Sequence, residues 1–250
     1  MPYTKTYAQQ MDEVLRTLDG RRPRPTLLLH ACCGPCSSAV LEQLCACFDV
    51  TILYYNPNTW PAAEYRRRGE ELRRFVAEAR PRGVTVVEDA YEPETFYAAV
   101  RGLEDEPERG RRCTVCYRLR MEHAAQYAQA HGFDWFTTTL SVSPHKDAAR
   151  INAIGQELAA RYGVPHLPSD FKKHNGYLRS LQLSADYGLY RQDYCGCEFS
   201  ARARAAAEAR RAADAAAQTG SAAQSGETAA QTTEPAPAAG PAPQNSDRPG

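Results

Sequence analysis

Seven of the nine cysteines in this 250-residue sequence fall into three short groups, and such grouping favours metal or redox chemistry. The groups are Cys32, Cys33 and Cys36, then Cys113 and Cys116, and finally Cys195 and Cys197. The start, MPYTKTYAQQMDEVL, has no apolar signal core, and no stretch approaches the length of a membrane span. We therefore expect a cytoplasmic protein that meets no membrane, a setting in which structural disulfide frameworks are rare.

The first two groups have the spacing of an iron–sulfur site. Cys113-Thr-Val-Cys116 places two thiols three residues apart at an expected helix start, close enough to bind one metal ion or two irons of one cluster. The adjacent Cys32 and Cys33 suit two different irons better than a single tetrahedral ion. Together these thiolates would satisfy a [4Fe–4S] cluster, and neighbouring helix N-termini and arginines would favour their ionised form.

A structural zinc site is the alternative for these thiols. Zinc bound by four cysteines usually uses two C-x-x-C hairpins, whereas one half of this set reads CC followed by GPC. The spacing therefore favours the cluster. Cys45 and Cys47 lie among Leu41, Leu44 and Phe48 instead, and we expect them to pack as small apolar residues.

The segment Cys33-Gly-Pro-Cys36 also matches the active-site sequence of thioredoxin, which likewise follows a strand and begins a helix. A thioredoxin-like dithiol oxidoreductase is therefore a rival hypothesis. Two observations count against it. Cys32 occupies the position of the tryptophan that normally precedes that motif, and a thioredoxin has no use for the two further cysteine groups.

The segment Cys195-Gly-Cys197 allows two interpretations. A disulfide across one residue would close a strained ring of the labile, redox-active kind, and Gly196 would ease the bend. Alternatively both thiols, together with Cys36, would hold a second metal ion beside the cluster. The sequence alone does not choose between these roles.

The elements that must position these cysteines alternate between short apolar runs and longer helical patterns. Strands are expected at 26–29, 50–55, 84–87, 134–138 and 163–167, and helices at 7–18, 37–47, 61–80, 93–102, 115–131 and 147–162. The alternation predicts an α/β fold, a parallel sheet flanked by helices on both faces. Ligands of such sheets bind beyond the carboxyl ends of the strands, which is where HACCGPCSS, YYNPNTW and TTLSVSPHK would lie.

Composition divides the rest of the chain. We expect an N-terminal helix and basic linker at 1–25, a catalytic iron–sulfur domain at 26–200, an alanine-rich helix at 201–217 and a disordered tail at 218–250. The tail has no Leu, Ile, Val, Met or aromatic residue, so it cannot bury enough apolar surface to offset its chain entropy. The net charge is zero, yet arginine-rich runs leave room for a basic face. We read the run at 65–75 as a solvated helix face.

Six motifs together resemble those of the QueH family, the cobalamin-independent epoxyqueuosine reductases. They are HACCGPCSS, YYNPNTW, GRRCTVCYRLR, FTTTLSVSPHKD, LPSDFKKHNGY and LYRQDYCGCEFS. The resemblance covers about residues 26–200. It implies an adenine-nucleotide-alpha-hydrolase-like (HUP-like) fold. It also implies reduction of epoxyqueuosine to queuosine at the wobble position of tRNA, the last step of queuosine biosynthesis.

The resemblance further implies roles for the cysteines and partners for the protein. The residues expected to ligate a [4Fe–4S] cluster are Cys32, Cys33, Cys113 and Cys116. Those expected to form a redox-active pair, or to bind a second mononuclear metal of iron or zinc, are Cys195, Cys197 and, for the metal, Cys36. The partners are tRNA and an unidentified electron donor.

Binding of an anticodon loop requires exposed aromatic and basic side chains near the strand ends, because loop bases are read by stacking and edge hydrogen bonds. The candidates are Tyr54, Asn56, Trp60, Lys146, Lys172, Lys173, Tyr190 and Arg191. Among the histidines, His145 and His174 could donate protons, whereas His30, at the end of a buried strand, is expected to be structural.

Two other functional classes compete with the reductase. A nucleotide-activating tRNA-modifying enzyme would need a phosphate loop rich in glycine and serine after the first strand, and this loop offers only Gly34 with Ser37 and Ser38. A zinc-stabilised tRNA-binding module would be colourless, whereas an iron–sulfur protein is brown.

Overall fold

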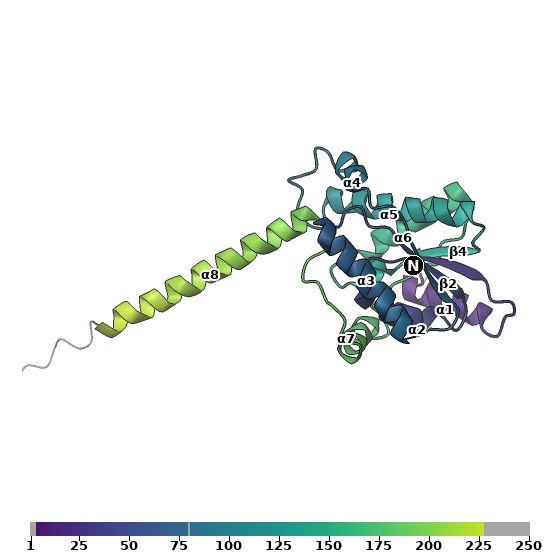
Figure 1. Ribbon diagram of the computed structural model, residues 1–250, viewed down its shortest axis with the longest axis horizontal. Helices are drawn as coiled ribbons and strands as arrows, with labels where there is room; N and C mark the ends of the chain where they lie inside the picture. Colours follow the sequence, from purple (N-terminus) through teal and green to yellow (C-terminus); the bar gives the residue numbers. More distant parts are fainter. Residues whose placement is uncertain (1–3, 80, 228–250) are drawn as a thin grey trace, which may run out of the picture. The chain divides into compact units, whose positions relative to one another are not determined.

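A computed structural model of the protein describes residues 4–79 and 81–227 (Figure 1). The helices are α1 (Tyr7–Leu18), α2 (Gly34–Leu44), α3 (Ala62–Ala79), α4 (Pro93–Ala99), α5 (Arg111–Ala130), α6 (Ala148–Tyr162), α7 (Gly176–Asp186) and α8 (Glu198–Glu227), with a 3₁₀ helix η1 (Thr139–Val142). The strands are β1 (Thr26–His30), β2 (Asp49–Tyr54), β3 (Val84–Glu88) and β4 (Trp135–Thr138). The chain divides into a unit that ends at Arg202 and a second unit that begins at Ala203.

The strands form one parallel sheet in the order β3-β2-β1-β4. The expectation of an α/β fold with a parallel sheet flanked by helices is thus confirmed. The chain moves outward from β1 through β2 to β3 and then returns to place β4 on the other side of β1. Ligands of such sheets bind where the strand order reverses, at the carboxyl ends of the two strands that flank that point. Here the point lies between β1 and β4.

Helices cover both faces of the sheet (Figure 1). Alternate residues of a strand point to opposite faces, so the buried run in β1 serves two cores. Leu27 and Leu29 pack in a cluster with residues of α1, α2 and α3, whereas Leu28 packs with residues of α5 and α6. Each of these leucines is fully buried. The central strand is therefore fixed from both sides, and the loop that leaves it has a rigid base.

Two elements differ from the sequence prediction. The strand expected at 163–167 is reduced to a single bridge between Phe136 and His166. The sequence also does not reveal α7, because small residues such as Ser180 and Ser184 make its buried face while Leu178 is 54% exposed. Apolar periodicity marks a buried face only where large apolar residues form that face.

The C-terminal segment is helical beyond the expected boundary. Helix α8 runs from Glu198 to Glu227, so the first part of the tail predicted at 218–250 is helix, and residues 228–250 lie outside the described residues. Every side chain from Arg202 to Ala216 is exposed, as expected for an alanine-rich helix without a large apolar stripe. Among the described residues, no helix has the length and apolar character that crossing a membrane requires.

A close contact between α6 and the segment after it gives the first prediction. A Cβ added to Gly155 would lie 2.5 Å from Cγ of the buried His166 ring. Alanine ordinarily stabilises a helix interior by about 1 kcal/mol relative to glycine. We expect Gly155→Ala to destabilise the protein by about 1–3 kcal/mol in denaturant titrations, because the overlap outweighs that gain. The control Gln156→Ala changes an exposed neighbour and leaves stability within about 0.5 kcal/mol. Equal stability of Gly155→Ala would contradict this packing.

Two buried histidines make stability depend on pH. Burial lowers the pKa of His30 and of His166 from 6.5 to about 3. Between these values the unfolded chain binds protons that the folded protein does not, so their contribution is present above pH 6.5 and lost as the pH falls. We expect each histidine to remove about 2 kcal/mol of stability between pH 7 and pH 5.

The measurement is the free energy of unfolding of the protein and of two variants at both pH values. His166→Gln loses one of the two histidines and therefore shows a smaller decrease, whereas His131→Gln, which changes an exposed ring, matches the parent protein. A decrease in His166→Gln as large as that of the parent would refute the assignment.

Candidate metal centre

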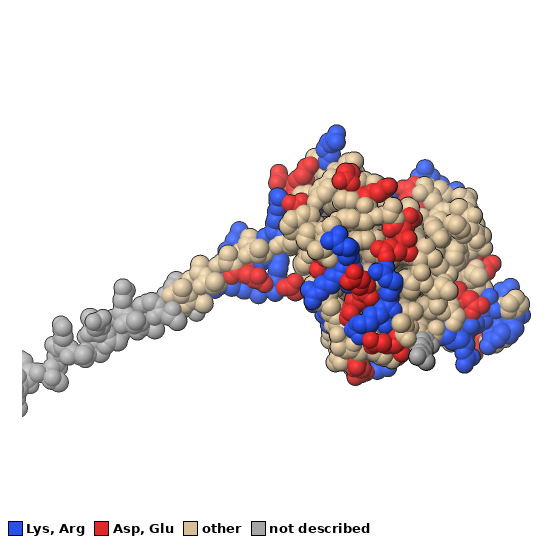
Figure 2. Space-filling view, viewed as in Figure 1, with Lys and Arg blue, Asp and Glu red and all other residues tan. Residues whose placement is uncertain are grey.

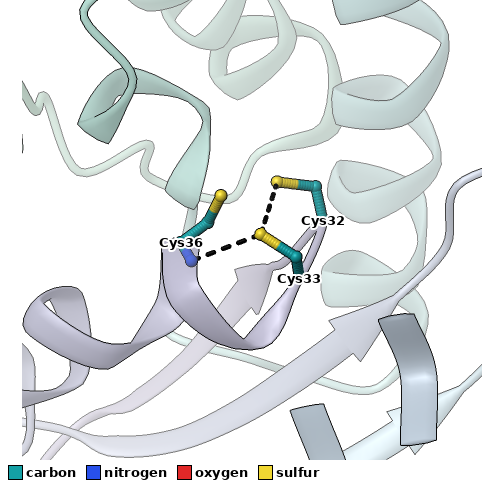
Figure 3. Close-up of side chains that lie close together, drawn as sticks. All are labelled: Cys32, Cys33 and Cys36. Atoms are coloured by element: carbon teal, nitrogen blue, oxygen red, sulfur yellow. Dashed lines mark hydrogen bonds between the residues drawn. The ribbon is translucent and has the colours of Figure 1, made fainter. Parts of the chain in front are cut away.

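The first cysteine group is gathered by one tight turn between β1 and α2. Cys33 is the N-cap of α2, and its sulfur accepts a hydrogen bond from the backbone N–H of Cys36 at 3.3 Å. The sulfurs of Cys32 and Cys33 lie 3.8 Å apart. All three sulfurs of the group lie within 4.8 Å of one another and face one another (Figure 3). The segment CCGPC, with Pro35 in the first turn, thus folds locally into a cluster of potential metal ligands.

The second cysteine group lies in the first turns of α5. The sulfur of Cys113 accepts a hydrogen bond from the backbone N–H of Arg109 at 3.2 Å, and Cys116 is 7% exposed. Cys113 packs against the apolar cluster that contains Cys32 and Cys33. The start of α5 therefore reaches the loop that follows β1.

The third group completes a pocket with the second. Cys195 and Cys197 line the same pocket as Cys113 and Cys116, together with aromatic side chains and with charged ones such as Arg112. Gly196 adopts a φ of 122°, a left-handed conformation that favours glycine, and its carbonyl accepts the backbone N–H of Trp60 at 2.8 Å. Neither sulfur of this group is in a disulfide, since all nine cysteines are free thiols in the structure.

Two cations connect the three groups. The guanidinium of Arg120 interacts electrostatically with Cys32, Cys116 and Cys195, one residue from each group. The ammonium of Lys146 interacts with Cys32 and Cys195 as well. A single side chain reaches residues of all three groups only if they converge, so the loops distant in sequence meet at one place.

Burial outweighs the helix N-termini and arginines that were expected to favour ionised thiols at most of these cysteines. Burial raises the pKa of Cys33 and of Cys116 to about 12, so these thiols stay protonated at neutral pH without a metal. Hydrogen bonds with Cys33 and Cys36 instead hold the pKa of Cys32 well below its ordinary value. A bound metal ion deprotonates its thiol ligands outright. Thiols from three loops beside buried cations are a donor set that fits an iron–sulfur cluster.

Two of the predicted tRNA contacts lie inside the protein, which corrects the expectation that they are exposed. Tyr54 is fully buried at the end of β2, and its hydroxyl donates to the carbonyl of Tyr65 at 2.7 Å. Asn56 is 1% exposed, and its Nδ2 donates to the carbonyl of Ala31 at 2.9 Å. Both follow a strand that α3 and the first cysteine loop cover, so neither offers a surface to a base.

The remaining candidates are at least partly accessible. They are Trp60, Lys146, Lys172, Lys173, Tyr190 and Arg191. Lys172 pairs with Asp170 at 2.6 Å. The Tyr190 hydroxyl donates to Glu64, and the guanidinium carbon of Arg67 lies 3.3 Å from its ring centroid. Among this set, Lys146 is the residue whose charge interacts with the cysteines.

Of the three histidines considered from the sequence, His30 has the structural role that was expected of it. His30 is fully buried, with Nδ1 2.8 Å from the Thr138 hydroxyl and Nε2 3.1 Å from the carbonyl of Tyr55, so it is structural. His145 and His174 are exposed on the surface. Neither is among the residues that line the cysteine pocket.

Sequence reasoning missed two residues that hold the site together. Figure 2 shows positive and negative side chains intermixed along α3, as expected for the run at 65–75, but Arg68 in that run is 2% exposed. Its Nε donates to Glu64 at 2.7 Å and its Nη1 donates to the carbonyl of Cys195 at 3.3 Å. Gln192 donates from Nε2 to the sulfur of Cys33 at 3.2 Å. The spacing of Glu64 and Arg68 indicates a helical pair, but only the fold shows that the C-terminal segment covers it.

Comparisons with known proteins identify the family of this chain. The family model "Epoxyqueuosine reductase QueH" matches residues 27–203. "Epoxyqueuosine reductase QueH" of Streptococcus pyogenes serotype M1 is 42% identical over 199 residues, which are 78% of this chain and 78% of that protein. The protein of the same name from Staphylococcus epidermidis is 43% identical over 201 residues, 76% of this chain and 84% of that protein.

More distant relatives include "Epoxyqueuosine reductase QueH" of Thermotoga maritima, which is 35% identical over 72% of this chain and 92% of that protein. Among solved structures, the U34-tRNA thiolase NcsA from Methanococcus maripaludis with its [4Fe-4S] cluster aligns with a TM-score of 0.44 and 10% identity. The alignment covers 78% of this chain and 70% of that chain, and the likeness is too distant to carry an argument. The matched segment contains all three cysteine groups. By its family-model match and these identities, the chain belongs to the epoxyqueuosine reductase QueH family.

Proposed function

We propose that this protein is an epoxyqueuosine reductase, which reduces the epoxide of epoxyqueuosine in the tRNA wobble position to queuosine. The observation that carries the proposal is the convergence of three cysteine groups on one place beside buried cations, in a chain of the QueH family. A thioredoxin would use one cysteine pair, whereas here the sulfurs of Cys32, Cys33 and Cys36 lie within 4.8 Å of one another and four further cysteines line one pocket. We propose the cytoplasm, where tRNA is modified, as the place of action.

The cofactor that we propose is a [4Fe–4S] cluster. The residues that would ligate it are Cys32, Cys33, Cys113 and Cys116. When bound, such a cluster supplies electrons singly at low potential. An electron donor outside this chain has to replenish them, and we propose that the reaction depends on this cluster and needs no cobalamin.

Two of the remaining thiols, those of Cys195 and Cys197, line the same pocket as Cys113 and Cys116. Cys195 and Cys197 are free either to hold a second mononuclear metal, iron or zinc, together with Cys36, or to cycle as a redox-active pair. The hydrogen bonds that fix the main chain around Gly196 hold both sulfurs at the pocket in either role.

The protein's own residues would stabilise the negative charge that develops on the epoxide oxygen during the reaction. Removal of the epoxide oxygen as water takes two electrons and two protons and leaves a carbon–carbon double bond. The departing oxygen gains negative charge, which a positioned cation or proton donor stabilises. Burial acts to lower the pKa of Lys146, but the neighbouring thiols raise it overall, so its Nζ keeps a proton in reach of their charge. The side chains of Phe96 and Tyr117 give the pocket an apolar wall that excludes water.

The nucleosides of tRNA test the proposed reaction directly. A strain that lacks this gene should accumulate the epoxide-bearing nucleoside and lose queuosine, and the restored gene should reverse both changes. Mass spectrometry of digested tRNA measures the two nucleosides. Normal queuosine in the deletion strain, with no second epoxyqueuosine reductase gene present, would refute the proposal.

The proposed ligand set predicts the effect of one substitution. Cys113→Ala removes a thiolate ligand, so we expect loss of the brown colour, of bound iron and of turnover in anaerobically purified protein. Cys45→Ala is the matched control, because Cys45 packs against the apolar core away from the site and should leave colour and activity unchanged. Visible absorption, iron content and conversion of epoxyqueuosine tRNA are the measurements. Full activity in a colourless Cys113→Ala protein would rule out the cluster.

A further inference from the structure

A buried arginine lies among the cysteines, and no carboxylate of the described residues forms an ion pair with it. Arg120 follows Cys116 by four residues in α5, and its side chain is 2% exposed. Its Nε donates to the carbonyl of Cys116 at 3.1 Å, whereas its Nη2 has no hydrogen-bond partner among residues 4–79 and 81–227. A buried charge without a partner is strongly unfavourable. Its position calls for an anion that the protein chain does not supply as a carboxylate.

The two other buried arginines are balanced differently. Arg68 pairs with the carboxylate of Glu64 at 2.7 Å. Arg112 donates from Nη1 to two carbonyls, at 2.6 and 3.2 Å, and its guanidinium lies over the ring of Phe199. Nη2 of Arg68 and Nε of Arg112 also have no hydrogen-bond partner among the described residues, but Arg120 differs from both in having neither a carboxylate nor a second carbonyl as a partner there.

The groups that face Arg120 are sulfurs. It interacts with Cys116, Cys195 and Cys32, and although burial acts to lower the pKa of Arg120, these thiols raise it overall. The anion that Arg120 meets is therefore sulfur that has lost its protons, which is the state of thiols that ligate a metal.

We propose that Arg120 is the buried counter-charge of the cluster-ligating thiolates and that it raises the reduction potential of the cluster. This inference rests on the cofactor proposed above. Reduction adds a negative charge to the site, and a fixed positive charge in a water-free interior stabilises the added electron. Lys146 also faces the sulfurs, but it is only half-buried, so solvent screens its charge more strongly. Arg120 is thus a positioning residue for charge and need not touch the substrate.

The test is an anaerobic redox titration of the iron-loaded protein, followed by visible absorption and electron paramagnetic resonance. At a fixed solution potential, we expect the ratio of reduced to oxidised cluster to be at least ten times smaller in Arg120→Met than in the parent. For a one-electron couple this corresponds to a reduction potential lower by about 59 mV. Arg120→Lys keeps the charge and should titrate like the parent. Arg118→Met is the matched control. It removes a positive charge from the same helix, but Arg118 pairs with Glu157 at the surface, so this variant should titrate like the parent.

A second measurement separates this role from a purely structural one. In protein stripped of iron, Arg120→Met removes a buried cation, so the variant should unfold at the same or a higher denaturant concentration than the parent. A structural role through the bond to Cys116 would instead make the stripped variant less stable. A less stable or unfolded stripped variant would therefore overturn the proposal, as would an unchanged titration of the loaded variant.

Failure of the cofactor proposal gives a different result. Parent protein that binds no iron would be colourless before any variant is compared, and this outcome would overturn the cluster and the role of Arg120 together. Parent protein with a cluster whose titration does not respond to Arg120→Met would overturn the role of Arg120 and leave the reductase intact.

Discussion

Charge in the interior at the carboxyl end of β1 is the constraint on which the rest of this structure depends. A thiolate or a guanidinium is costly to bury alone, and each becomes tolerable in the presence of the other. Arg68 and Arg120 lie buried beside cysteines from segments distant in sequence. Removal of one member would leave another charge unmatched, so the site is a property of the whole set and needs every loop in place.

The sheet order explains why the loops can meet. The strand order places β1 between β2 and β4, so the loops after β1 and β4 leave from the point where the order reverses. Helix α5 packs across β1 and β4, which brings the start of α5 and its cysteines to the same edge. The fold therefore supplies the convergence, while the cysteine-bearing turns contribute only local geometry.

The sequence predicted those parts of the protein that local patterns encode. The turn CCGPC, the C-x-x-C at the start of α5 and the alternation of strands and helices are all set by residues close in the chain, and each is found in the structure. What the sequence did not reveal depends on long-range burial. Arg68 reads as a surface residue until the C-terminal segment covers it, and Tyr54 reads as a base-stacking ring until α3 packs on it. Side-chain type gives no indication of such coverage.

The main chain of the C-x-C segment, residues 195–197, is held in place by hydrogen bonds from other parts of the chain. Its main chain is held at the carbonyl of Cys195 by Arg68 and at the carbonyl of Gly196 by the backbone of Trp60. Tyr194 donates its hydroxyl to the carbonyl of Trp60, which ties the same turn to the loop after β2. Because the backbone groups are already satisfied, the turn gains nothing by rearranging. The sulfur of Cys197 accepts the backbone N–H of Ser200 at 3.4 Å, and both sulfurs still line the pocket. The chemistry of the segment is therefore set by what the sulfurs bind or exchange with and not by a change of loop conformation.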